Sequence, residues 1–487
     1  MIKNYLRIAL RNLQRHKAFS VINITGLAIG IAACLLLFTV VKYELSYDTF
    51  QPNYKRIYHV VTQDKFSDGI TYNPGVPVAA LDALRLQMPN VLFANIFANY
   101  GSQVTVNSSG STSFDKKFIE ETGMFFCEPK FFQVFNYHWL EGNSNVLNEP
   151  NTVVLTKKVA EKYFGNWQKA IGKTIRLDNA ITLKVSGILQ DVPLNTDFPL
   201  GVLISFETLK ANADKYNYHT DWNNLSSNFQ VFTLLPPEVK ADNINDQLLL
   251  FSKDHYTDKR ASVRLNFLQP LSKLHFDTRF DIFGDHRTSM STLWTLSLIG
   301  IFIIIMACIN FINLSTAQAV GRSKEIGVRK VLGSNRRQLF FQVMGETALI
   351  VITAVILAIC IASLCLPFIK HFASIEESLN LFNFQTFIFI VSIVIIVTIL
   401  SGLYPSFTLS RYNPALALKN KITSANVGGI PLRRGLVVTQ FAISQILIIG
   451  TIIAVSQMSF VNHADLGFNK EAVLLLSANS DSAVVAR

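Results

Sequence analysis

Charged side chains are scarce in this chain of 487 residues. Asp, Glu, Lys and Arg make up 16% of it, whereas soluble globular proteins carry about 25%. Hydrophobic residues reach 50%, and the mean hydropathy is +0.31. These values exclude a disordered chain, a collagen and a small disulfide scaffold. Cysteine is rare as well, and only Cys127 lies outside the long apolar runs, so we expect no internal disulfide and no zinc spacing.

Motifs of known enzymes are missing. The string GNWQKAIGKT (165–174) approaches a phosphate-binding loop, but Trp167 stands where that loop needs glycine. The nine histidines show no HExxH spacing, and no GxSxG elbow occurs. The pairs Asp254–His255 and Asp285–His286 are interpreted as polar surface pairs. The sequence therefore predicts no catalytic residue, no metal site and no bound cofactor, and the chain is not expected to be an enzyme.

Long apolar runs dominate what is present. Five runs are long enough to cross a hydrocarbon core of about 30 Å as helices. They cover residues 18–41, 293–317, 347–369, 384–407 and 435–459. Inside lipid, each backbone group must be hydrogen-bonded within its own segment, so each run should be helical. The alternative of a buried core helix suits runs of about 10–14 residues. The first run is also too long for a cleaved signal peptide, so we expect a retained span.

Positive charge is concentrated beside these runs. The segments 1–20, 318–343 and 408–434 hold 16 basic residues and one acidic residue, while the rest of the chain holds 28 basic and 32 acidic residues. By the positive-inside rule, these three segments face the cytoplasm. Residues 42–292 then lie outside, as does the loop 370–383. Because the basic segments are short and adjacent to the membrane, we expect no nucleic-acid partner.

The N-terminal residues have the pattern of an amphipathic helix. Over residues 2–13, Lys3, Arg7 and Arg11 fall on one helical face, and apolar residues fall on the other. The basic face predicts a helix that lies flat on membrane lipids before the first span. The alternative is a cytosolic stub that packs on nothing.

Residues 42–292 have the composition of a folded domain. The runs NTVVL (151–155), KTIRL (173–177) and ITLKVSGIL (181–189) predict strands, and KKVAEKYFG (157–165) predicts a helix. We therefore expect a mixed α+β domain, with a possible division into two subdomains near residue 200. The fold class predicted for the whole chain is an α-helical integral membrane protein with five spans and a large α+β extracytoplasmic domain.

Two further patterns concern the membrane part. The basic string RSKEIGVRKVLG (322–333) predicts a short helix ended by Gly333, although its charge could serve only as a topology signal. A basic stretch leading into a span also occurs twice, at 6–41 and at 432–459. The chain is therefore expected to be one half of a larger protein with the first span of the other half.

Five stretches of the sequence carry a resemblance to a known family. YDTFQPNYKRIYHV (47–60), the region 153–198 with VVLTKKVAEKYFG, and QPLSKLHF (269–276) resemble a MacB-like extracytoplasmic core domain. GRSKEIGVRKVLGSNRRQLFFQVMGET (321–347) and LYPSFTLSRYNPALALK (403–419) resemble an FtsX-like permease core. The chain thus resembles the MacB/FtsX-type permeases of ABC transporters, the mechanotransmission (type VII) class, truncated relative to members with two halves.

This resemblance implies a domain plan with the following bounds. Residues 1–17 would form the cytoplasmic amphipathic helix, 18–41 the first span, 42–292 the MacB-like core domain, 293–420 the FtsX-like core with three spans, and 421–487 the start of the second repeat. The implied location is the bacterial inner membrane, with the N-terminus cytoplasmic and the large domain periplasmic or extracellular.

The resemblance also implies partners and a function. A separate ABC ATPase subunit would use ATP and dock on the segment that contains Arg322, Glu325, Ile326, Gly327, Arg329 and Lys330. The chain would form a homodimer or pseudo-dimer, with a periplasmic adaptor and an outer-membrane channel as further partners. The expected function is efflux of antimicrobial peptides, macrolides or similar amphiphiles. The alternatives are lipoprotein release and a signal relay that controls a cell-wall hydrolase or a sensor kinase. A membrane-anchored enzyme or receptor is a third class.

Overall fold

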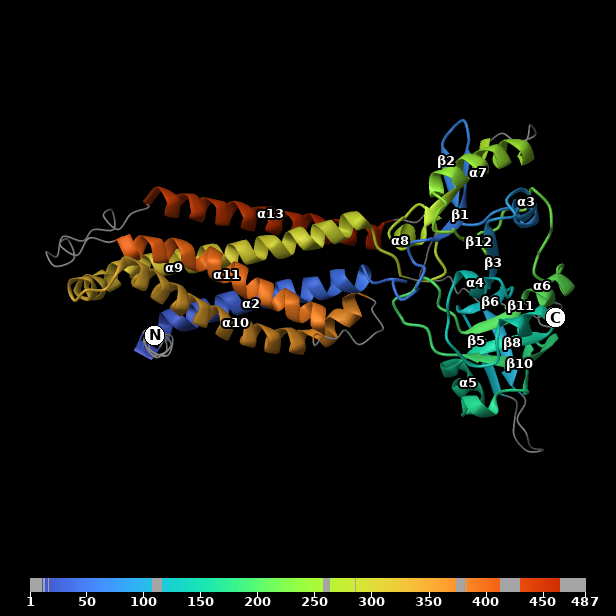
Figure 1. Ribbon diagram of the computed structural model, residues 1–487, viewed down its shortest axis with the longest axis horizontal. Helices are drawn as coiled ribbons and strands as arrows, with labels where there is room; N and C mark the ends of the chain where they lie inside the picture. Colours follow the sequence, from blue (N-terminus) through green and yellow to red (C-terminus); the bar gives the residue numbers. More distant parts are fainter. Residues whose placement is uncertain are drawn as a thin grey trace. The chain divides into compact units, whose positions relative to one another are not determined.

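Two compact units make up the fold of this protein, seen in a computed structural model (Figure 1). The structure describes residues 11, 14, 15, 17–106, 116–256, 263–284, 286–373, 381, 383–411 and 430–464. Among the described residues, the helical unit takes those up to 43 and those from 291 to 464, and the sheet unit takes those between 44 and 290.

Five long helices form the described part of the helical unit (Figure 1). They are α2 (Lys17–Glu44), α9 (Met290–Val331), α10 (Arg336–Ala373), α11 (Phe384–Arg411) and α13 (Ile430–His463). Each contains a stretch that is long and apolar enough to cross a membrane, which confirms the five predicted spans. The helices extend past the apolar runs because the flanking polar residues continue the same backbone hydrogen-bonding.

Four of these helices pack around a common apolar cluster. It contains Leu27 and Ile31 of α2, Phe311 of α9, Val351 and Ala358 of α10, and Val397 of α11. Small residues bring α2 and α9 together, since a Cβ atom on Gly30 would lie only 3.0 Å from the Cβ atom of Ala307. By contrast, only 6% of the apolar stretch of α13 is buried, against 22–39% in the other four helices. Most of α13 is therefore open to lipid or to another protein.

One mixed sheet organises the sheet unit. Its strands are β1 (Ile57–Lys65), β2 (Ile70–Asn73), β3 (Leu92–Asn99), β4 (Ser102–Val106), β5 (Lys116–Glu120), β6 (Met124–Cys127), β7 (Trp139–Glu141), β8 (Thr152–Thr156), β9 (Thr174–Leu177), β10 (Ile181–Leu189), β11 (Val202–Ser205), β12 (Phe229–Leu234) and β13 (Val263–Pro270). The order is β13-β1-β12-β3-β6-β11-β8-β10-β9-β4-β5, with β2 beside β1 and β7 beside β10. Most neighbours are antiparallel, and β10–β8 and β11–β6 are parallel.

Both faces of this sheet are covered. Along β8, Val153 and Leu155 enter one apolar cluster and Val154 enters the other, as the two-residue period of a strand requires. The first cluster is covered by α3 (Ala80–Gln87), α5 (Lys157–Phe164), α6 (Phe206–Ala211) and α7 (Ala241–His255). The second is covered by α4 (Phe131–Val134), the 3-10 helix η1 (Ser144–Asn148) and α8 (Leu271–Leu274). A further 3-10 turn, η2 (Trp167–Lys169), follows α5.

The sequence predicted part of this unit correctly. The strands β8, β9 and β10 and the helix α5 lie where their runs predicted them. The division near residue 200 is not found, because β11, which begins at Val202, pairs with both β6 and β8 in the same sheet. One continuous sheet thus takes the place of two subdomains in the part of the domain that the structure describes.

The imidazole of His59, on β1, is buried and stacks on the ring of Phe232. The two ring centroids are 4.4 Å apart, and the side chain is 1% exposed. Burial lowers the pKa of His59 to about 3, against smaller opposing effects of Gln269 and the backbone at Pro74. The pKa of a histidine in an unfolded chain is about 6.5. Between that pH and about 3, the unfolded chain therefore binds a proton at this residue and the folded domain does not.

We therefore expect the stability of the sheet unit to fall as the pH drops from about 6.5 toward 3, by about 1.4 kcal/mol per pH unit from this residue. The substitution His59→Leu should flatten that acid slope of the melting temperature. His219 is exposed, so His219→Leu should leave the slope unchanged. Thermal unfolding of the purified chain between pH 7 and 5 measures both variants, and equal slopes would contradict the account.

Candidate functional site

The segment predicted to couple the chain to an ATPase is the end of α9. A separate short helix was expected over residues 322–333, but α9 runs unbroken from Met290 to Val331, so that expectation is wrong. The apolar run within α9 ends at residue 317. Residues 318–331 therefore extend the same helix by about 20 Å beyond it, at 1.5 Å per residue. The sequence contains no proline there, and its lysine, arginine and glutamate residues favour helix.

Gly333 ends this helix, as the sequence predicted. Its φ is +95°, and nothing lies within 4 Å of the place where a Cβ atom would be. The N–H of Ser334 donates to the carbonyl of Arg329, and the N–H of Gly333 donates to that of Lys330. This pair of bonds is the Schellman arrangement, which requires a left-handed residue at the glycine position. The chain then reverses into α10, which begins at Arg336.

The predicted charges are held within the helical unit. Arg329 donates to Glu325 at 2.6 Å and to the Oε1 atom of Gln342 at 2.9 Å. Gln342 in turn donates to Glu346 at 3.2 Å, so these bonds run from α9 into α10. These contacts fix the end of α9 to α10.

Lys330 connects the same helix end to α11. Its Nζ atom donates to the carbonyl oxygen of Ser410, 2.8 Å away, near the end of α11. Burial lowers the pKa of Lys330, and the charge of Arg336 adds to this shift. Ile326 is 6% exposed and packs inward. Charged and apolar contacts together make the end of α9 a firmly supported structure.

The outer surface of this hairpin is apolar with a basic border. Val328, Val331 and Leu332 are 47%, 64% and 80% exposed, and the i, i+3, i+4 spacing places them on one helical face. Arg336 and Arg337 are exposed just after the turn. We call these five residues the tip surface.

The remaining predicted residues are less well described. Arg11 is helical and exposed, while Lys3 and Arg7 lie outside the described residues. The same holds for the side chain of Arg322. Gly327 lies buried in α9.

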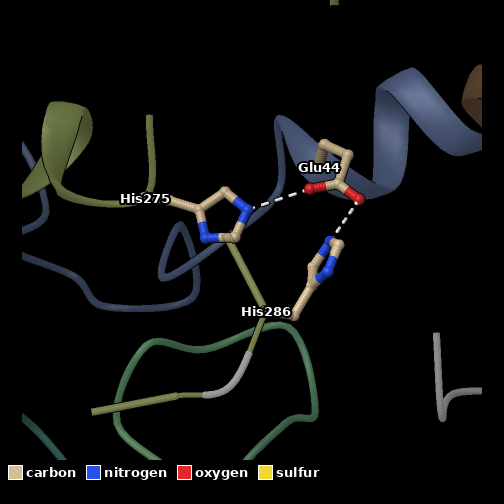
Figure 2. Close-up of side chains that lie close together, drawn as sticks. All are labelled: Glu44, His275 and His286. Carbon is tan, nitrogen blue, oxygen red and sulfur yellow. Dashed lines mark hydrogen bonds and ion pairs between the residues drawn. The ribbon is translucent and has the colours of Figure 1, made fainter. Parts of the chain in front are cut away.

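A second group of polar residues, in the sheet unit, was not predicted. Glu44, the last residue of α2, accepts from the Nε2 atoms of both His275 and His286, each at 2.9 Å (Figure 2). The Nδ1 atom of His275 lies 2.8 Å from an oxygen of Asp197. We call Glu44, Asp48, Asp197, His275 and His286 the histidine cluster.

Asp48 completes the histidine cluster. Its carboxylate accepts from the hydroxyl of Thr196 and, at 3.2 Å, from the backbone N–H of Asp197. Burial raises the pKa of both Asp48 and Asp197. Burial alone would lower the pKa of His275, but its bonds to Asp197 and Glu44 outweigh this effect and raise the pKa to about 9.

The interpretation of Asp285–His286 as a surface pair is wrong for His286, whose side chain is 31% exposed and bonds Glu44. Only the motif strings offered a signal for the histidine cluster. YDTF contains Asp48, and QPLSKLHF contains His275. Their positions are far apart in the chain, so spacing alone could not unite them.

The chain is similar to known proteins in both units. The family model of the MacB-like periplasmic core domain matches residues 20–249, and that of the FtsX-like permease C-terminal domain matches residues 297–414. Together these matches cover most of the chain and agree with the resemblance found in its sequence.

Three relatives illustrate the similarity. The macrolide export ATP-binding/permease protein MacB of Pasteurella multocida is 20% identical over 85% of this chain and 60% of its own length, and MacB of Haemophilus ducreyi is 24% identical over 60% and 39%. The chain thus spans less than two thirds of these two relatives. The uncharacterized ABC transporter permease YvrN of Bacillus subtilis is 22% identical over 85% of this chain and 99% of its own length. A crystal structure of a domain assigned to a permease protein of Porphyromonas gingivalis, 18% identical, covers 47% of this chain and 94% of its own, with a TM-score of 0.37.

Gly333 offers a test of the helix end. In Gly333→Val, a β-branched residue must adopt a left-handed conformation, which costs about 1–2 kcal/mol. We expect faster amide hydrogen exchange over residues 326–331 in this variant, measured by mass spectrometry. Gly333→Asn is the matched control, because asparagine tolerates that conformation, and it should exchange nearly as the parent chain does. Equal exchange in the valine variant and the parent would contradict the role of this glycine.

Proposed function

We propose that this chain, which belongs to the MacB/FtsX-type permeases of ABC transporters, passes the work of ATP hydrolysis in a separate ATPase subunit to its MacB-like domain. The observation that carries the proposal is the continuity of α9, from the tip surface through a membrane-compatible stretch to Met290. A single helix transmits displacement along its axis far better than two helices joined by a loop. The ATPase activity would then belong to the partner.

The tip surface is the proposed docking site for that ATPase subunit. Its apolar residues lie beyond the apolar run of α9 and are exposed. Exposed apolar patches with a polar border are typical of protein interfaces. The border here is basic, which suits an acidic rim on the partner and speeds its association. The internal bonds of Arg329 and Lys330 keep this surface in shape, so their proposed role is support.

Orientation follows from charge. The tip surface belongs to a segment rich in lysine and arginine, and the positive-inside rule assigns such segments to the cytoplasm. The sheet unit, with balanced charge, would then be extracytoplasmic, and the membrane would be the bacterial inner membrane. Pairing into a homodimer or pseudo-dimer, and assembly with an adaptor and an outer-membrane channel, belong to the same proposal.

The proposed substrate is an amphiphile such as a macrolide or an antimicrobial peptide. Support comes from two relatives named as macrolide export proteins. Lipoprotein release and signal relay would use the same coupling helix. Experiments on the tip surface therefore do not distinguish efflux, lipoprotein release and signal relay. Identification of the transported or regulated molecule does.

Leu332 provides the sharpest test of docking. It is 80% exposed, so Leu332→Glu should leave the fold intact while it places a desolvated charge in the interface. We expect at least a tenfold loss of co-purifying ATP-binding subunit and of ATPase activity in the membrane complex. Leu86→Glu is the matched control, since Leu86 on α3 is 83% exposed in the sheet unit. Charge reversal at Arg329 and Lys330 is a less clean test because it also breaks their internal bonds.

Resistance of the cells gives the second measurement. Cells that carry Leu332→Glu should become as sensitive to macrolides or antimicrobial peptides as cells that lack the chain, and Leu86→Glu should preserve resistance. Undiminished association of the ATPase subunit in the Leu332→Glu variant would overturn the docking surface. If Leu332→Glu abolishes association of the ATPase subunit but leaves drug sensitivity unchanged, efflux is overturned as the function of the complex.

A further inference from the structure

Side chains from distant parts of the sheet unit converge on the Glu44 carboxylate. His275 and His286 lie 231 and 242 residues further along the chain, and each directs its Nε2 atom at a different carboxylate oxygen of Glu44 (Figure 2). One donor atom from each of these three residues lies within 4.8 Å of the other two. We propose that Glu44, His275 and His286 bind a divalent transition-metal ion, with Zn²⁺ as the best match.

The distances favour such a site. Tetrahedral Zn²⁺ holds imidazole nitrogen and carboxylate oxygen at about 2.0–2.2 Å, which places neighbouring donor atoms about 3.3 Å apart. Each nitrogen lies 2.9 Å from a different oxygen of Glu44, within a few tenths of an ångström of that spacing, and the ligand atoms of all three residues lie within 4.8 Å of one another. Two imidazoles and one carboxylate are the ligand set of several zinc sites that keep a fourth position open.

The surroundings of His275 resemble the outer shell of a metal site. Its second ring nitrogen, Nδ1, faces an Asp197 oxygen at 2.8 Å. A carboxylate at this position orients the ring and leaves the opposite nitrogen directed at the metal. The ring of Tyr47 stacks on the imidazole, with centroids 3.5 Å apart, and restricts its rotation. His275 is thus positioned from two sides.

Burial and charge also favour a cation. The side chains of Glu44 and His275 are 4% and 2% exposed, so water does little to screen them. Asp48 and Asp197 add two more buried carboxyl groups to the same cluster, and the Oδ2 atom of Asp197 has no hydrogen-bond partner. Three carboxyl groups and two imidazoles thus share one buried region, and a bound divalent ion would stabilise the charged form of the carboxyl groups around it. His286 is 31% exposed and offers an access route from solvent.

A metal at this position would act as a clip on the sheet unit. Glu44 stands where the chain enters this unit, and His286 stands four residues before α9 begins at Met290. A bond between them closes almost the whole length of the domain, and cross-links that close long loops stabilise most in principle. The ion would therefore fix both chain ends of the domain to each other, independently of which substrate or partner the permease serves.

The test measures metal binding to the full-length chain in detergent. The purified chain is stripped with a chelator and dialysed against Zn²⁺ alone, and the bound metal is counted by mass spectrometry. We expect one Zn²⁺ per chain, a rise in melting temperature on loading, and the intense visible absorption of tetrahedral Co²⁺ when cobalt replaces zinc. These measurements are independent of transport and of ATPase activity.

Variants locate the ion. Glu44→Gln and His286→Gln should lose bound Zn²⁺, while Asp197→Asn, which keeps the three ligands, should weaken binding about 10–100-fold. His219→Gln, at an exposed histidine, is the matched control and should bind as the parent chain does. The proposal is overturned if the folded parent chain stays free of Zn²⁺, which would leave the cluster as a network of charged hydrogen bonds. It is overturned equally if Glu44→Gln and His286→Gln retain the metal.

Discussion

Hydrocarbon offers a peptide group no hydrogen-bond partner, and this constraint determines the helical unit. Each apolar run has to satisfy its backbone internally, so all five become helices. The basic segment that follows the apolar run of α9 continues the same helix, because lysine, arginine and glutamate are good helix formers. The helix ends only where Gly333 supplies a left-handed residue. Continuity of α9 is thus a consequence of the membrane constraint and of local helix propensity.

The sheet unit follows a different logic. Its core lies on both faces of one sheet, so the strands alternate between two apolar clusters. Polar groups in its interior must then be paired, and the histidine cluster satisfies most of its buried atoms by bonds among its own members. Burying several ionisable groups together costs desolvation free energy. The presence of such an energetic cost in the fold suggests a specific role, for which metal binding is the proposal.

Several features were predictable from the sequence because their signals are local. Hydropathy identified every described span, and strand-forming runs identified β8, β9 and β10. The glycine signal at Gly333 was correct as well. The continuity of α9 was not predicted, because a basic segment beside a span is equally consistent with a separate short helix. The order of the strands depends on pairings between segments distant in the chain, such as β1 with β13, and Glu44 lies 231 residues from His275. One sequence contains no signal for such contacts.

The coupling account depends on sidedness, since the tip surface must meet ATP in the cytoplasm while the sheet unit lies outside. Cysteine accessibility measures this directly. In a chain whose five native cysteines are replaced, a cysteine is placed at residue 332 or at residue 86 and treated with a membrane-impermeant maleimide. When the outer surface of the inner membrane is exposed to the reagent, the account predicts labelling at residue 86. Residue 332 should be labelled only after the membrane is permeabilised. Labelling of both positions from the same side of the intact membrane would contradict it.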